Sequence, residues 1–198
     1  MLVCTMSPLG CAKQEKFELP RTAADDVPLN ERIKKAHEHA LAAQNAETAG
    51  QTDKAIALYQ QAIQSHREFP AAWLNLGVLQ MKVKNNLEAV DAFNVASELD
   101  PDDPRPYFNV ATIYDEKHYY KEAIKQYNLA LEKDPNLLPA LRRSIYLEMQ
   151  TNSFTPATKD RVLRGLLMEK DQQYINIFSQ AKIRIDNEVL GVDAPPGH

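Results

Sequence analysis

Hydrophobic residues recur three and four positions apart along most of the chain, with polar residues between them. In one such stretch, Ala89, Phe93 and Ala96 fall on the same side of a helix of 3.6 residues per turn. The dipeptide Asp100–Pro101 follows, and a residue before proline is biased away from helical dihedral angles. The pattern therefore predicts an amphipathic helix that ends at this dipeptide.

Matching positions of this pattern lie 34 residues apart, as between Phe93 and Tyr127 or between Pro101 and Pro135. The same interval separates Trp73 from Tyr107, Ala89 from Ala123, and Ala96 from Ala130. A fixed period of this length is typical of stacked repeats of one supersecondary unit. We therefore predict an all-α array of helix pairs. Small residues would let the helices approach, and the aromatic rings would fill the space beside them.

The repeated unit resembles the tetratricopeptide repeat (TPR), a helix–turn–helix family with characteristic aromatic, small and proline positions. In residues 70–103 the matching residues are Trp73, Leu76, Gly77, Ala89, Phe93, Ala96 and Pro101. In residues 104–137 they are Tyr107, Val110, Ala111, Tyr114, Ala123, Tyr127, Ala130 and Pro135. The resemblance implies a right-handed α-solenoid of antiparallel helix pairs. It says less about function, because one scaffold serves many partners.

The period also predicts how the chain is divided, with Asn30 as the N-cap of the first helix. Arg161 and Arg164 stand where the family has an aromatic residue and Ala, so the fourth repeat is degenerate. The last helix carries Tyr174, Ile177, Phe178, Ala181 and Ile185 on one face, as a helix covered on one side only would. The predicted units are a TPR domain at 30–190, repeats at 36–69, 70–103, 104–137 and 138–170, and a capping helix at 171–190.

Both ends of the chain lack this periodicity. Residues 1–11, MLVCTMSPLGC, resemble the end of a bacterial lipoprotein signal, in which Cys11 would carry the lipid. The hydrophobic run is short and no Lys or Arg precedes Cys11, although a start codon upstream would supply both. The alternative is a disordered cytoplasmic tail. We predict a flexible linker at 12–29 and a disordered tail at 191–198.

The composition of the chain argues against several classes of function. The net charge of −4 gives no indication of non-specific nucleic-acid binding. The two cysteines, Cys4 and Cys11, both precede the repeats, so the repeats hold neither a disulfide framework nor a thiolate metal site. No glycine-rich phosphate loop is present, and His37 and His39 are two residues apart, which does not place two ligands on one helix face. We therefore expect no enzymatic activity, no metal and no cofactor.

In TPR arrays the first helices of successive repeats line a concave groove that holds a peptide. Asn75 and Asn109 share the sixth position of their repeats, where many family members use an Asn to bond a peptide backbone, since an amide both donates and accepts. Carried over onto this chain, the predicted groove residues are Leu74, Asn75, Val78, Met81, Arg105, Phe108, Asn109, Thr112, Arg142, Arg143 and Tyr146.

Charge in the predicted groove comes mainly from arginine. Arg105, Arg142 and Arg143 present planar donor forks that suit a partner's carboxylates, and the alternative is a solvated charged face. Asp115 belongs to the same predicted lining. The family's clamp for chaperone C-terminal carboxylates needs Lys and Asn in the opening repeat. Ala40 and Gln44 stand there instead, so a chaperone-tail clamp is not expected.

The sequence thus predicts a non-catalytic scaffold or assembly adaptor that holds a peptide or subunit in its groove and leaves its oligomeric state open. With a lipid on Cys11 it would resemble bacterial TPR lipoproteins, anchored in the cell envelope on the periplasmic side. Without the lipid it would be cytoplasmic. Two alternatives remain: a structural subunit that uses its convex face or helix ends, and a regulatory subunit of an enzyme complex.

Overall fold

The computed structural model describes residues 27–190, and within that range every regular element is a helix. The predictions for residues 1–11, for nearly all of the linker and for residues 191–198 lie outside the described range. The helices are α1 (Leu29–Thr48), α2 (Thr52–Ser65), α3 (Pro70–Lys82), α4 (Asn86–Leu99), α5 (Pro104–Glu116), α6 (Tyr120–Lys133), α7 (Leu138–Thr151), α8 (Pro156–Met168) and α9 (Gln172–Leu190).

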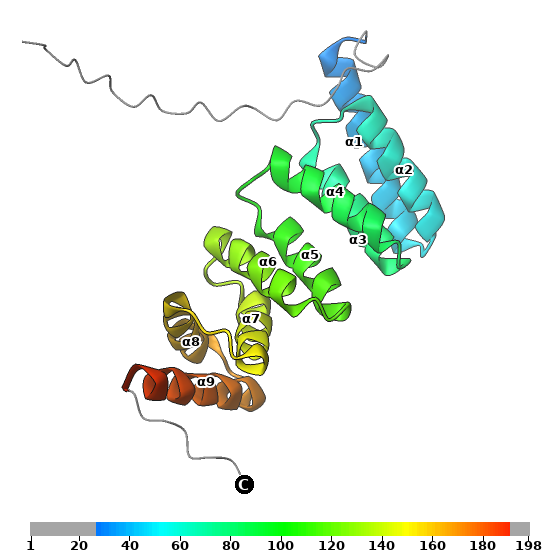
Figure 1. Ribbon diagram of the computed structural model, residues 1–198. Helices are drawn as coiled ribbons and strands as arrows, with labels where there is room; N and C mark the ends of the chain where they lie inside the picture. The colour runs from blue at the N-terminus through cyan, green and yellow to red at the C-terminus, as the bar shows by residue number, and fades with distance from the viewer. Residues whose placement is uncertain (1–26, 191–198) are drawn as a thin grey trace, which may run out of the picture.

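The helices follow one another along an elongated array, from α1 in blue to α9 in red (Figure 1). The first helices of the repeats, α3, α5 and α7, begin at Pro70, Pro104 and Leu138, so each start lies 34 residues after the previous one. Each of α4 and α6 ends directly before an Asp–Pro dipeptide, as the sequence predicted. The predicted all-α array of helix pairs is confirmed.

Close helix contacts explain the small residues of the pattern. A Cβ atom added to Gly77 on α3 would lie 2.6 Å from the ring of Phe93 on α4, which is itself fully buried. Gly165 on α8 has the same relation to Phe178 on α9, again at 2.6 Å. Neither position has room for a side chain, so in each pair the backbone of the first helix packs directly against an aromatic ring of the second.

The start of the first helix differs from the prediction. The carbonyl oxygen of Pro28 accepts hydrogen bonds from the backbone N–H groups of Glu31 and Arg32, at 3.0 and 3.1 Å. Helical bonding therefore begins at Pro28, which is the N-cap, and Asn30 lies inside the first turn. The prediction of Asn30 as the N-cap was wrong because a proline two residues earlier already supplies the first acceptor.

One atypical residue of the degenerate repeat, Arg161, forms a buried ion pair. Arg161 on α8 takes the aromatic position of the family and is 8% exposed. Its guanidinium donates to the carboxylate of Glu148 on α7, which is fully buried, and to the hydroxyl oxygen of Thr158. Glu148 Oε2 and Arg161 Nε have no hydrogen-bond partner. A charge pair thus replaces the ring that would otherwise fill this interface.

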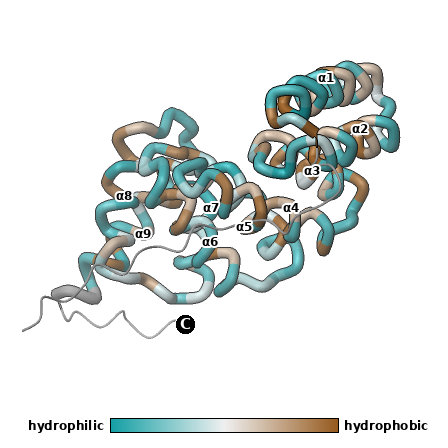
Figure 2. Tube along the Cα trace, turned by 90° about the horizontal axis from the view of Figure 1, so that it is seen from above, coloured by the Kyte–Doolittle hydropathy of each residue, from teal (hydrophilic) through white to brown (hydrophobic). Residues whose placement is uncertain are grey.

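Hydrophobic and hydrophilic positions alternate along the helices rather than forming long apolar runs (Figure 2). Among the described residues, no helix is both long and apolar enough to cross a membrane. On α9, Phe178, Ala181 and Ile185 are buried in a hydrophobic cluster that runs through α5, α6, α7 and α8. This is the face that the sequence predicted to be covered.

Candidate binding groove

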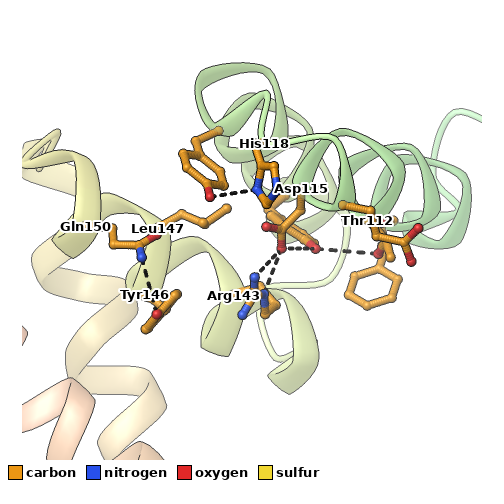
Figure 3. A pocket seen from close by; sticks show the side chains of 11 residues that line it. Thr112, Asp115, His118, Arg143, Tyr146, Leu147 and Gln150 are labelled. Carbon is orange, nitrogen blue, oxygen red and sulfur yellow. Dashed lines mark hydrogen bonds and ion pairs between the residues drawn. The ribbon is translucent and has the colours of Figure 1, made fainter.

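A pocket of about 450 Å³ opens between α5, α7 and the start of α6 (Figure 3). Two of its walls come from the first helices of successive repeats, which is where the resemblance placed a groove. The rings that line it belong to Phe108 on α5, Tyr120 and Tyr127 on α6, and Tyr146 on α7. Phe108 and Tyr127 are in ring contact, with centroids 5.7 Å apart.

A charge pair crosses the pocket from α5 to α7. Arg143 donates to the Oδ2 atom of Asp115 from Nε at 2.8 Å, and its Nη2 lies 2.6 Å from the same oxygen. The Tyr127 hydroxyl also donates to Oδ2, at 3.4 Å, and lies 3.5 Å from the Thr112 hydroxyl. Burial raises the pKa of Tyr127, so the phenol stays protonated and can donate to the carboxylate. Figure 3 shows Arg143 pointing toward Asp115, with Thr112 on the same helix as Asp115.

Five residues of the predicted lining meet in this pocket: Phe108, Thr112, Asp115, Arg143 and Tyr146. Asn109 follows Phe108 on α5 and is half-buried. The sequence missed Tyr120, Tyr127, Leu147 and Gln150, which also line the pocket. Tyr127 matched the family's packing aromatic and was assigned to the core. Gln150 stands near the end of α7, four residues beyond Tyr146, the last position that we carried over.

The α3 part of the predicted groove is less open. Leu74 is only 4% exposed and packs in the hydrophobic cluster with Phe93 and Val110, so it is not available to a ligand. Val78 and Met81 are half-buried against the same cluster. Asn75 is half-buried next to the Tyr59 hydroxyl of α2. Of the predicted groove residues on this helix, Asn75, Val78 and Met81 therefore present surface.

All three predicted groove arginines are bonded to carboxylates of the chain itself. Arg105 forms hydrogen bonds to both oxygens of Asp103, the residue that caps α5. Arg142 forms two bonds of 2.7 Å to Glu169, and its guanidinium lies 4.2 Å from the ring centroid of Tyr174. Arg143 pairs with Asp115, as above. A partner's carboxylate would have to displace one of these internal partners.

The Arg142–Glu169 pair fixes the turn between α8 and α9. The carboxylate of Glu169 is 1% exposed, and it also accepts the backbone N–H groups of Lys170 and Asp171 at 2.9 Å each. The hydrogen bonds from Arg142, reinforced by those N–H groups, lower the pKa of Glu169 from 4.5 to about 2. Protonation of this carboxylate would therefore loosen the turn.

We expect the chain to lose stability on acidification through this group. Because the folded-state pKa of Glu169 is depressed, its contribution is complete above the unfolded value of 4.5 and is lost as the pH falls toward about 2. The variant Glu169→Gln should lose about 1–3 kcal/mol of unfolding free energy at neutral pH. Urea unfolding at several pH values should show the difference between the two proteins shrinking below about pH 4. A difference that stays constant with pH would contradict this role.

Among residues 27–190, no group of three or more His, Cys, Asp or Glu is arranged to hold a metal ion.

His118 hydrogen-bonds to the Tyr120 hydroxyl through Nδ1 at 2.8 Å, on the rim of the pocket. The pocket therefore offers aromatic surface, a compensated charge pair and hydrogen-bonding groups at its edge. Such a pocket is suited to binding a ligand.

Two models of the tetratricopeptide repeat family match the chain, one over residues 46–110 and the other over residues 104–137. Together with the 34-residue spacing of the helix starts, these matches decide the family. The chain is a TPR protein. Its fold is that of a family of protein-interaction scaffolds.

Solved structures share the fold of this TPR protein. The first TPR of Spaghetti (RPAP3) bound to an HSP90 peptide has a TM-score of 0.57 and 21% identity, over 61% of this chain and 96% of that one. The crystal structure of MamA has a TM-score of 0.58 and 15% identity, over 85% of this chain and 88% of that one. At these identities the likeness shows the fold alone.

Curated relatives match part of the TPR protein. Human superkiller complex protein 3 is 33% identical over 94 residues, which make up 48% of this chain and 6% of that protein. The human protein O-mannosyl-transferase TMTC3 is 31% identical over 114 residues, or 56% of this chain and 12% of that protein. The matched regions thus span a small fraction of either relative.

Proposed function

We propose that this TPR protein is a non-catalytic scaffold that holds an extended segment of another protein along α3, α5 and α7. The observation that carries the proposal is the pocket itself, because its walls come from the first helices α5 and α7 of two successive repeats. A ligand lying there would contact the array where its repeats meet. The solved likeness that holds an HSP90 peptide supports peptide binding as a use of this fold.

Two amides give the groove a means of holding a peptide backbone. Asn109 is half-buried, follows the pocket residue Phe108 on α5, and makes no side-chain hydrogen bond to another described residue. Asn75 has the same position one repeat earlier. An amide side chain both donates and accepts, so each can bond a peptide unit whatever its side chain is. Ala40 and Gln44 still argue against a chaperone C-terminal tail as the ligand.

A crosslinked pull-down tests this function. The variant Asn75→Ala/Phe108→Ala/Asn109→Ala removes both amides and one ring from the groove. A matched control, Gln60→Ala/Asn94→Ala/Tyr119→Ala, removes two amides and one ring from exposed positions on α2, α4 and the start of α6. We expect a partner captured by the wild type to be captured at least about tenfold less by the groove variant and equally well by the control.

Far-UV circular dichroism should first show that both variants remain helical. Loss of the partner from the control alone would favour the second candidate function, a subunit that binds through its outer helices. Equal capture by all three proteins would overturn the groove. Running the pull-down on membrane and soluble fractions, with Cys11→Ser as a further variant, tests the proposed lipid anchor: membrane recovery should depend on Cys11.

A further inference from the structure

The pocket between α5, α6 and α7 is electrically balanced. Asp115, whose side chain is 10% exposed, has its charge offset by Arg143 at 2.6 Å. Glu116 lies on the rim and has Lys84 at 3.5 Å. A ligand anion drawn to the guanidinium of Arg143 would also meet the carboxylate of Asp115, and a ligand cation drawn to that carboxylate would also meet the guanidinium. Either would therefore be repelled, or would have to break an existing pair.

The walls of the pocket are aromatic. Rings from Phe108, Tyr120, Tyr127 and Tyr146 surround the balanced charge pair, and Arg143 itself lies 5.2 Å from the Tyr146 ring centroid. Offset or edge-to-face contacts between aromatic rings stabilise a complex beyond the free energy gained by burying the rings. Such walls favour a flat, uncharged ring over an aliphatic chain of similar size.

A further hydrogen-bonding group, the amide of Gln150, lies at the edge of the pocket. Gln150 donates to the Tyr146 hydroxyl at 3.3 Å through its Nε2 atom, and its Oε1 atom accepts none of the bonds in this cluster. Gln150 is exposed, so its amide can reorient toward a ligand. An occupant with an N–H or O–H at the far edge of its ring could be satisfied there.

We propose that this pocket is a subsite for a neutral aromatic side chain with a polar edge, tryptophan or tyrosine, from the bound segment. The inference rests on the proposed function, since the side chain belongs to a peptide held in the groove. Phe108 lines the pocket and Asn109 is the next residue. An extended strand bonded by Asn109 points alternate side chains to opposite sides, so one of them can enter the pocket.

Small probes test the subsite without the peptide. The full chain is titrated with N-acetyl-tryptophanamide and, separately, with the corresponding leucine, lysine and glutamate amides, and binding is followed by proton–nitrogen correlation spectra. We expect the tryptophan probe to bind with a Kd of about 1 mM, and the other three about tenfold more weakly or worse. The shifts should centre on Thr112 and the Gln150 side-chain amide. Raising the salt concentration should leave the tryptophan affinity unchanged, because the pocket is balanced.

Two variants and one control localise the site. Thr112→Phe places a ring in the pocket and should weaken the tryptophan probe at least about tenfold. Gln150→Ala removes the edge amide from an exposed position, cannot disturb the core, and should weaken the probe about threefold. Thr48→Phe is the matched control: like Thr112, Thr48 donates from its hydroxyl to a carbonyl four residues earlier, but it is exposed on α1. It should bind as the wild type does.

No binding of the tryptophan probe, tighter binding of a charged probe, or an unchanged affinity in both pocket variants would overturn the subsite. These failures differ from failure of the proposed function. If the groove variant loses its partner but the tryptophan probe does not bind to the wild type, the subsite is contradicted and the proposed function is not. A probe that binds at Thr112 while the groove variant keeps its partner would leave a ring-binding pocket on a protein whose partner binds elsewhere.

Discussion

Replacing Glu148 with alanine is expected to lower the unfolding free energy of the C-terminal part of the array by about 3–5 kcal/mol. The change leaves Arg161, which is 8% exposed, with a buried positive charge and only the Thr158 hydroxyl as a hydrogen-bond acceptor. Solvating that charge requires water to enter between α7 and α8. Urea unfolding followed by far-UV circular dichroism measures the loss. Amide hydrogen exchange should place the loss in α7, α8 and α9, since repeats contact only their neighbours.

An exposed pair provides the matched control for this experiment. Glu38 on α1 lies 3.9 Å from Lys34 with 64% of its side chain exposed, so Glu38→Ala should change stability by about 0.5 kcal/mol or less. The double variant Glu148→Leu/Arg161→Met replaces the buried pair with apolar side chains and should regain most of the lost stability. If Glu148→Ala proved no more destabilising than Glu38→Ala, the pair would not be buried as described.

Replacing Gly77 with valine is expected to lower stability by about 2–3 kcal/mol and the melting temperature by about 4–12 °C. The new Cβ atom would start 2.6 Å from the Phe93 ring, and that ring is fully buried and has no free space to move into. Either α3 and α4 must separate or the ring must leave its preferred rotamer. Differential scanning calorimetry measures the effect.

The clash can be separated from the intrinsic cost of valine in a helix. Ala57→Val, at an exposed position of α2, measures the cost of valine relative to alanine and should be about 0.5 kcal/mol. Glycine in a helix costs about 1 kcal/mol relative to alanine, so helix propensity alone would not make Gly77→Val destabilising, and its loss of stability reports the clash. Phe93→Leu replaces the ring with a shorter side chain that relieves the clash. The double variant Gly77→Val/Phe93→Leu should therefore lose less unfolding free energy than the sum of the two single losses. Simple additivity would mean that the two residues do not touch.

The fold could be predicted from the sequence because the residues that specify it recur at a fixed interval. Small and aromatic residues at a 34-residue interval determine where helices begin, end and touch, and the structure follows them from α3 to α7. Asn30 failed as an N-cap because capping depends on which carbonyl first accepts a helical bond, and Pro28 accepts it. The pairing of Arg161 with Glu148 was missed because Arg161, taken alone, only weakened the match to the family, and its partner lies 13 positions away on the preceding helix.

The site was predicted less completely. Arg142 and Arg143 find their carboxylates 27 and 28 positions away, at Glu169 and Asp115, so their pairing appears only when the helices are assembled. Arg105 and Asp103 are only two residues apart, but the sequence analysis assigned Arg105 to a partner's carboxylate or to a solvated face and did not pair the two. A helix-face pattern predicts which side chains lie near a groove. It does not predict which of their charges are already compensated, and that decides the chemistry of the ligand.

The claim that a partner lies along the first helices is tested most directly by site-specific photo-crosslinking. A benzophenone amino acid replaces Asn109 on α5 in one protein and Asn94, an exposed residue on the second helix α4, in another. Both proteins are irradiated in cells. If a partner lies along the first helices, we expect a crosslinked partner from position 109 and none from position 94. A crosslink from position 94 alone would contradict this claim and would place the binding surface on the second helices.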